Sequence, residues 1–148
     1  MAKKKTWLDK LKETKQPHIV KLEKAFAGIP AGSRLFIPSP KLIDEYIQHI
    51  GYGKRIDSKA MRNDLALEHN ADYTCPVTTG IFLRIVAEAN FEKLQQGKSL
   101  EEITPFWRVV EPNSTLSKKL TFGQEFIADQ REAEKINDYI GRQENHSH

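Results

Sequence analysis

Apolar residues recur along much of the chain at intervals of three and four positions, the spacing that gathers side chains on one face of an α-helix. The clearest case follows Ser39 and Pro40, since a capping hydroxyl and a proline in the first turn mark a helix start there. The apolar residues of that stretch are Leu42, Ile43, Tyr46, Ile47 and Ile50. The same pattern predicts helices over residues 17–28, 40–50, 59–69, 76–90 and 122–140, and Thr6 is expected to cap one or two helical turns before them.

Two short stretches depart from the helical spacing. Residues 34–37 form a brief apolar run that Pro38 stops, which indicates a strand or an extended segment. Residues 105–110 are aromatic and β-branched, and turn residues follow them at 111–114, which favours a strand and a wing. The polar stretch 91–104 is expected to be a surface connection.

The predicted helices 59–69 and 76–90 are joined by a link of a few residues, which is the outline of a helix-turn-helix. Small, uncharged residues open the second helix, and they allow another surface to approach closely; they are Thr78, Thr79 and Gly80. Arg84 follows one turn later. A plain helical hairpin fits the periodicity equally well.

Together these elements predict a mainly α protein with a small β element, namely a winged helix-turn-helix with extra N-terminal helices. Residues 1–38 are expected to form a basic N-terminal helical extension. Residues 39–142 are expected to form the winged-helix domain, and residues 143–148 a polar tail.

Composition agrees with one domain that has its own core, since the chain has 148 residues and a hydrophobic share of 39%. No stretch approaches the roughly 18 apolar residues of a membrane span, and the single cysteine, Cys75, has no partner for an internal disulfide. The lysines near the N-terminus are not followed by the apolar section of a signal peptide. We therefore expect a cytoplasmic protein without a membrane partner.

Charge is unevenly distributed, although the formal net charge is only +3. Residues 1–62 hold 14 Lys/Arg and 6 Asp/Glu, whereas residues 63–148 hold 9 and 14. A basic face is one signature of a protein that binds the phosphate backbone of nucleic acid. Lysine-rich helices with a solvated charged side give the same pattern.

The sequence offers little enzymatic chemistry. It has no glycine-rich phosphate loop, and its five histidines show no metal-ligand spacing, so neither a cofactor nor a metal site is expected. Cys75 is the one candidate nucleophile, because it precedes Pro76 at a predicted helix start, where the helix dipole favours a thiolate. The structural alternative is a small, buried cysteine at a helix cap.

Residues 103–110 and the helices around them carry a resemblance to a known family. Pro105, Arg108 and Val109 match a Pro-Cys-His-Arg-Val motif. Further along the chain, Leu116, Gly123 and Glu132 or Glu134 fall where that family has a leucine, a glycine and a final acidic residue. With the order of predicted helices around the Gly-Tyr-Gly-Lys turn, residues 39–136 resemble the C-terminal DNA-binding domain of O6-alkylguanine-DNA alkyltransferases, a winged helix.

The resemblance implies DNA binding without catalysis. Phe106 stands where the family has the cysteine that accepts an alkyl group, and Trp107 stands where it has a histidine. Neither ring can take the place of a thiolate nucleophile. The chain is therefore similar to the alkyltransferase-like proteins, which lack the cysteine, bind alkylated DNA and hand it to other repair machinery. It departs from the family near Thr78 or Thr79, where the arginine finger belongs, and at Ser58, where the turn tyrosine belongs.

The expected interface combines the helix-turn-helix with the cations around it. DNA contacts are predicted for Lys54, Arg55, Ser58, Lys59, Arg62, Thr78, Thr79, Arg84, Lys118 and Lys119. A pocket that stacks an extruded base is predicted from Pro105, Phe106, Trp107 and Arg108. A buried core is the other interpretation of these aromatic residues.

The expected partners are duplex DNA, with alkylated guanine as its lesion, and a repair protein. Two alternatives remain open at the level of sequence. One is an enzyme that uses Cys75 as its nucleophile, and the other is a winged-helix module that binds a protein instead of DNA.

Overall fold

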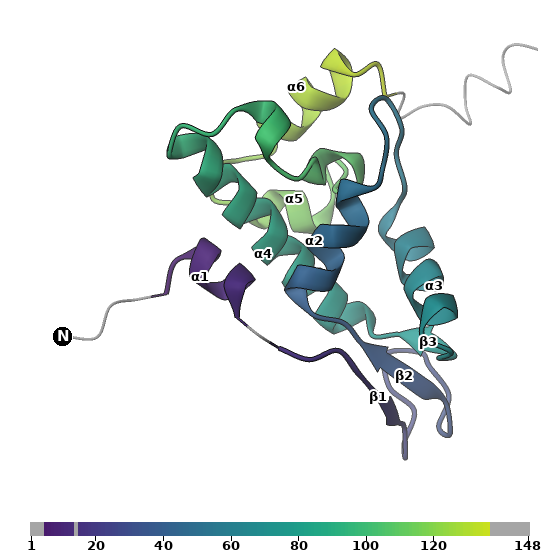
Figure 1. Cartoon of the computed structure of the whole chain (residues 1–148). Helices are drawn as coiled ribbons and strands as arrows, with labels where there is room; N and C mark the ends of the chain where they lie inside the picture. Colours follow the sequence, from purple (N-terminus) through teal and green to yellow (C-terminus); the bar gives the residue numbers. More distant parts are fainter. Residues whose placement is uncertain (1–4, 14, 137–148) are drawn as a thin grey trace, which may run out of the picture.

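Helices are the main regular structure of the chain, and a small sheet lies at one end of them (Figure 1). The computed structural model describes residues 5–13 and 15–136. The helices are α1 (Trp7–Lys12), α2 (Pro40–Gln48), α3 (Ser58–Glu68), α4 (Pro76–Gln95), α5 (Thr115–Lys119) and α6 (Glu125–Ala133), with short 3-10 turns at Leu100–Glu102 and Phe106–Arg108. The strands are β1 (His18–Lys21), β2 (Arg34–Ile37) and β3 (Tyr73–Thr74). The prediction of a mainly α protein with a small β element is confirmed.

Side chains that cap helix starts explain why several predicted boundaries are correct. The Ser39 hydroxyl accepts a hydrogen bond from the Leu42 amide at 3.1 Å, and the Asp57 carboxylate accepts one from the Ala60 amide at 2.8 Å. Thr6 forms a capping box with Asp9 at the start of α1. Each cap satisfies backbone amides that have no partner inside the helix, and it does so with residues close in sequence.

The small sheet has the strand order β1-β2-β3, with β1 antiparallel and β3 parallel to β2. The strand predicted over residues 34–37 is confirmed as β2. The helix predicted over residues 17–28 is wrong, because this segment contains β1. β1 pairs with β2 in an antiparallel register that places His18 opposite Ile37. A few apolar residues at helical spacing also suit an edge strand, and the pairing with β2 decides between the two.

The described part of residues 1–38 is therefore not a helical extension, because it contains β1 and β2 as well as α1. It packs directly on the rest of the molecule. α1 lies against α4 (Figure 1), and β2 pairs with β3, which follows α3 in the chain.

α4 is the central helix, and it is longer than predicted. It continues to Gln95 because Phe91, assigned to a surface connection, stacks on Phe122 with ring centroids 4.1 Å apart. Of the long helix predicted over residues 122–140, the described part up to residue 136 contains α6, Glu125–Ala133, which begins later than predicted and ends at Ala133. Residues 137–148, which include the predicted tail, lie outside the described residues.

The strand predicted over residues 105–110 is also wrong. Phe106–Arg108 is a 3-10 turn, in which the Phe106 carbonyl accepts hydrogen bonds from the amides of Val109 and Val110. Its aromatic and β-branched side chains serve the core rather than a sheet. Within residues 5–13 and 15–136 no strand follows β3, so the predicted wing strand is absent, and α5 occupies this part of the chain.

A buried polar cluster joins α2, α4 and the segment before the 3-10 turn. The Asn90 side-chain amide donates to the Asp44 carboxylate at 3.1 Å and to the Val86 carbonyl at 2.8 Å, and its oxygen accepts from the Thr104 amide at 2.9 Å. Asn90 is fully buried. A buried amide with all of its groups paired fixes how these segments meet.

We expect Asn90→Ala to lower the free energy of unfolding by about 2–4 kcal/mol, because it leaves the Thr104 amide and the Asp44 carboxylate buried with fewer partners. Urea denaturation followed by circular dichroism measures this change. Asn63→Ala is the matched control, since Asn63 is an exposed residue of α3. Equal stability of the two variants would contradict the role assigned to Asn90.

Candidate nucleic-acid interface

A groove runs beside the first turns of α4. It consists of two hollows that share Gly80 and Leu116 in their walls. The first, of about 310 Å³, lies between the start of α3, α4 and the segment from Val109 to Leu116. The second, of about 560 Å³, lies between α1, α4 and α5. We call the two hollows together the α4 groove.

The floor of the α4 groove is open because of Gly80. A Cβ atom built on this glycine would meet nothing within 4 Å, so the helix surface is accessible at this point. Two apolar side chains stand beside it: Val77 is 52% exposed and Ile81 is 57% exposed. The helical spacing of Ile81 with Ile85 and Ala89 predicts a buried face for Ile81, and its exposure shows that this prediction is wrong. The small and apolar residues together offer a close, dehydrated contact to another molecule.

Several of the predicted DNA-contacting residues do line the α4 groove. Ser58 and Lys59 lie in the wall of the first hollow, and Arg84 and Lys119 lie in the wall of the second. Lys118 is exposed on the same short helix as Lys119. The structure therefore brings the start of α3, the start of α4 and α5 to one surface.

The first hollow also contains carboxylates. Asp57 lines it and caps α3, and Glu111 lines it with a carboxylate 3.8 Å from the Arg55 guanidinium. Arg55 is thus partly neutralised by a neighbour. The remaining predicted contacts, Lys54 and Arg62, line neither hollow.

Thr78 and Thr79 at the start of α4 were both predicted to contact DNA, but they differ in exposure. Thr79 is fully buried, and its hydroxyl donates to the Cys75 carbonyl at 2.7 Å, so it does not face another molecule. A helix repeats every 3.6 residues, and Thr79 falls on the side that packs inward. Thr78 is half-buried, and its hydroxyl donates to the Cys75 sulfur.

Cys75 is a buried helix cap. Its side chain is 4% exposed, and its sulfur accepts a hydrogen bond from the Thr78 amide at 3.4 Å at the start of α4. Of the two interpretations of this residue, the buried cap agrees with its position. A substrate has no access to a thiol that is enclosed in this way.

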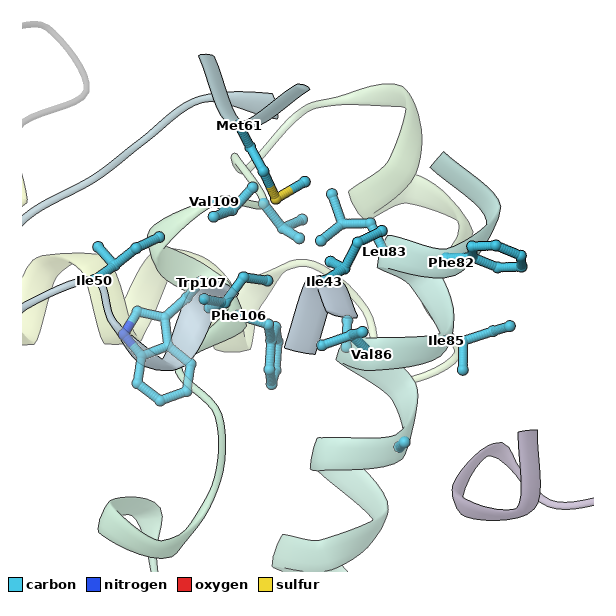
Figure 2. Packing of buried hydrophobic residues seen from close by; sticks show 14 of the residues in the cluster. Ile43, Ile50, Met61, Phe82, Leu83, Ile85, Val86, Phe106, Trp107 and Val109 are labelled. Carbon is cyan, nitrogen blue, oxygen red and sulfur yellow. The ribbon is translucent and has the colours of Figure 1, made fainter. Parts of the chain in front are cut away.

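The aromatic rings of the predicted base pocket lie in the core, although Pro105, Trp107 and Arg108 each contribute to the wall of a hollow of about 510 Å³. Phe106 is 0% exposed and Trp107 is 2% exposed, and Figure 2 shows both rings among buried side chains such as Ile43 and Ile50. The Phe106 ring also stacks on Phe126, at 5.8 Å between centroids. Neither ring is therefore open to stack an extruded base, because both rings fill the core, as residues with so much apolar area usually do.

Arg108 and Trp107 bind the same carboxylate. The guanidinium of Arg108 donates to Glu134 from Nε at 2.8 Å and from Nη2 at 2.9 Å, and the Trp107 Nε1 donates to it at 2.7 Å. The Gly53 amide donates to the same group at 2.9 Å. Arg108 is thus occupied by an internal ion pair and is not offered to a phosphate, while Pro105 lies half-buried beside it.

These contacts set the protonation of Glu134. Burial by itself raises the pKa of this carboxyl, but the hydrogen bonds from Arg108, the Gly53 amide and Trp107 outweigh burial. The net pKa is lower than the ordinary value of 4.5. Glu134 is therefore ionised in the folded protein at neutral pH.

Sequence patterns did not assign several residues of the second hollow to an interface, among them Trp7, Lys10, Val77 and Ile81. The i, i+4 spacing of Val77 and Ile81 marks one helix face, and only this spacing could have revealed them. Trp7 and Lys10 reach the groove because α1 docks on α4, which no local pattern indicates.

No protein-family model, no curated protein and no solved structure matches the chain. In the described part of the chain, no group of three or more histidine, cysteine or acidic side chains is arranged to hold a metal ion. No helix among the described residues combines the length and the apolar character needed to cross a membrane.

We expect Glu134→Gln to lower the free energy of unfolding by about 2–4 kcal/mol at pH 7, because it leaves the Arg108 cation buried without its counter-charge. The pKa of Glu134 is depressed in the folded state, so its contribution is complete above pH 4.5 and is lost as the pH falls through the folded pKa. Chemical denaturation between pH 3 and 7 measures the difference.

Glu132→Gln, a change at an exposed residue close to Glu134, is the control for this measurement. A stability gap between wild type and Glu134→Gln that stays constant as the pH falls would contradict the assigned ion pair.

Proposed function

We propose that this chain is a non-enzymatic DNA-binding protein in which α3 and α4 act as a helix-turn-helix and the α4 groove faces the duplex. The observation that carries the proposal is the open surface at Gly80, with Lys59, Arg84 and Lys119 around it. Helix-turn-helix proteins contact base edges with the first turns of the second helix. Val77 and Ile81 are apolar side chains of the kind that contact thymine methyl groups.

Electrostatics supports the same partner. Lysine and arginine side chains that neutralise phosphates release bound counterions, and this release supplies much of the affinity for DNA. Lys118 and Lys119 are exposed on α5, which lines the second hollow of the α4 groove together with α4. We assign these two residues to phosphate contacts that do not depend on base sequence.

The resemblance to alkyltransferase-like proteins adds a specific ligand to the proposal, namely a duplex containing O6-alkylguanine for a repair partner. The residue at the acceptor position, Phe106, has a hydrocarbon ring and lies in the core, which agrees with binding without covalent transfer. Because Phe106 and Trp107 are closed off, we place recognition of the base in the α4 groove and not between these rings.

The test is fluorescence anisotropy with a labelled duplex, either unmodified or carrying one O6-methylguanine, over a series of salt concentrations. We expect binding that weakens steeply as salt is added. Absence of binding at low salt would rule the proposed function out. Equal affinity for the two duplexes would leave DNA binding in place and remove alkylated guanine as the ligand.

Replacing Lys118 and Lys119 together by glutamine should reduce the slope of log affinity against log salt by about 2, because each lost phosphate contact removes about 0.9. The loss should be the same for every base sequence. The matched control is Lys24→Gln with Lys41→Gln, since both lysines are exposed and line neither hollow of the groove. An unchanged slope in the first variant would show that α5 makes no phosphate contact.

Gly80→Leu should weaken DNA binding at least tenfold, because the new side chain fills the surface that the duplex must approach. The same change should not destabilise the fold, because leucine is a better helix former than glycine by about 0.8 kcal/mol. Thermal unfolding and anisotropy are measured together, with Ala128→Leu, at an exposed residue of α6, as the control. Full DNA affinity in Gly80→Leu would contradict this binding face.

A further inference from the structure

The second hollow of the α4 groove has a wall that the helix-turn-helix does not supply. α1 contributes Trp7 and Lys10, α4 contributes Arg84 among others, and α5 contributes Lys119. One cation therefore comes from each of the three helices. No aspartate or glutamate lines this hollow.

Two other hollows of the described structure have carboxylates in their walls. The hollow of about 450 Å³ between α2 and α3 is lined by Glu45 and Glu68 and by no lysine or arginine. The hollow beside Arg108 is lined by Glu101, Glu102 and Glu134 as well as by cations. Of these three hollows, the one between α1, α4 and α5 best suits an extended anion.

α1 is held firmly enough to present its lysine. The Trp7 ring has the Lys10 ammonium 4.3 Å and the Arg84 guanidinium 5.1 Å from its centre, so it interacts with cations from both helices. The Leu8 amide donates to the Glu92 carboxylate of α4 at 2.8 Å. Leu11 is buried against the core. Lys10 therefore has a fixed place relative to α4.

We propose that α1 extends the DNA interface beyond the helix-turn-helix, so that the phosphate backbone of one strand lies between α1 and α5 and contacts Lys10, Arg84 and Lys119. This inference rests on the proposed function. Lys10 and Lys119, together with Arg84, whose guanidinium also lies 3.8 Å from the buried Glu88 carboxylate, give this hollow a cationic wall that suits a polyanion. The apolar Trp7 and Ile81 beside them cover the sugar edges of the backbone.

The experiment measures how salt affects the binding of an unmodified labelled duplex to the full chain. We expect Lys10→Gln to reduce the slope of log affinity against log salt by about 0.9 and to weaken binding roughly five- to tenfold at 0.1 M salt. Lys10→Arg keeps the charge and should restore the slope. Lys12→Gln is the matched control, because Lys12 is exposed on the same helix and does not line the hollow.

The outcomes separate this inference from the proposed function. If wild type binds the duplex and Lys10→Gln behaves like Lys12→Gln, the inference about α1 is overturned and the helix-turn-helix proposal stands. If wild type does not bind at low salt, both fail. If poly-glutamate displaces the duplex as effectively as an unlabelled duplex of equal charge, the groove takes an acidic protein segment, and the assignment to DNA is overturned.

Discussion

The Glu134 carboxylate is the interaction on which the arrangement of distant segments depends. It receives hydrogen bonds from Gly53, which precedes α3, from Trp107 and Arg108, which follow α4, and it lies itself just after α6. Arg108 adds a bond to the Ile50 carbonyl at 2.7 Å. A buried cation and anion that satisfy each other and their neighbours tolerate few alternative arrangements. This cluster therefore fixes where α3 and α6 meet the core.

α4 has a buried middle and an exposed start. Its middle is buried almost all round, as at Val86 and Ala87, which is typical of a central helix. Its first turns are different, because Val77 and Ile81 are exposed and Gly80 leaves the backbone accessible. The core thus holds the start of α4 in a fixed position, while the outer surface of this start stays exposed.

The charged side chains also fall into two groups, one paired inside the fold and one at the surface. Glu134 and Arg108 neutralise each other within the fold, whereas Lys10 and Lys119 line a hollow that contains no carboxylate. Surface cations of this kind are well hydrated and gain little from one another. Their arrangement around α4 agrees with the function we propose.

The sequence by itself determined the parts that depend on near neighbours. Caps at Thr6 and Ser39 and the apolar face of α2 were predicted correctly, because a helix start is satisfied within its own first turn. Only the tertiary structure decided the parts that need a distant partner: β1 is a strand because β2 pairs with it, and Phe106 is core because Phe126 packs on it. The site follows the same division. Arg84 and Lys119 were found from charge and helical position, whereas Lys10 joined them through the docking of α1 on α4, a contact between residues more than sixty positions apart that no local spacing encodes.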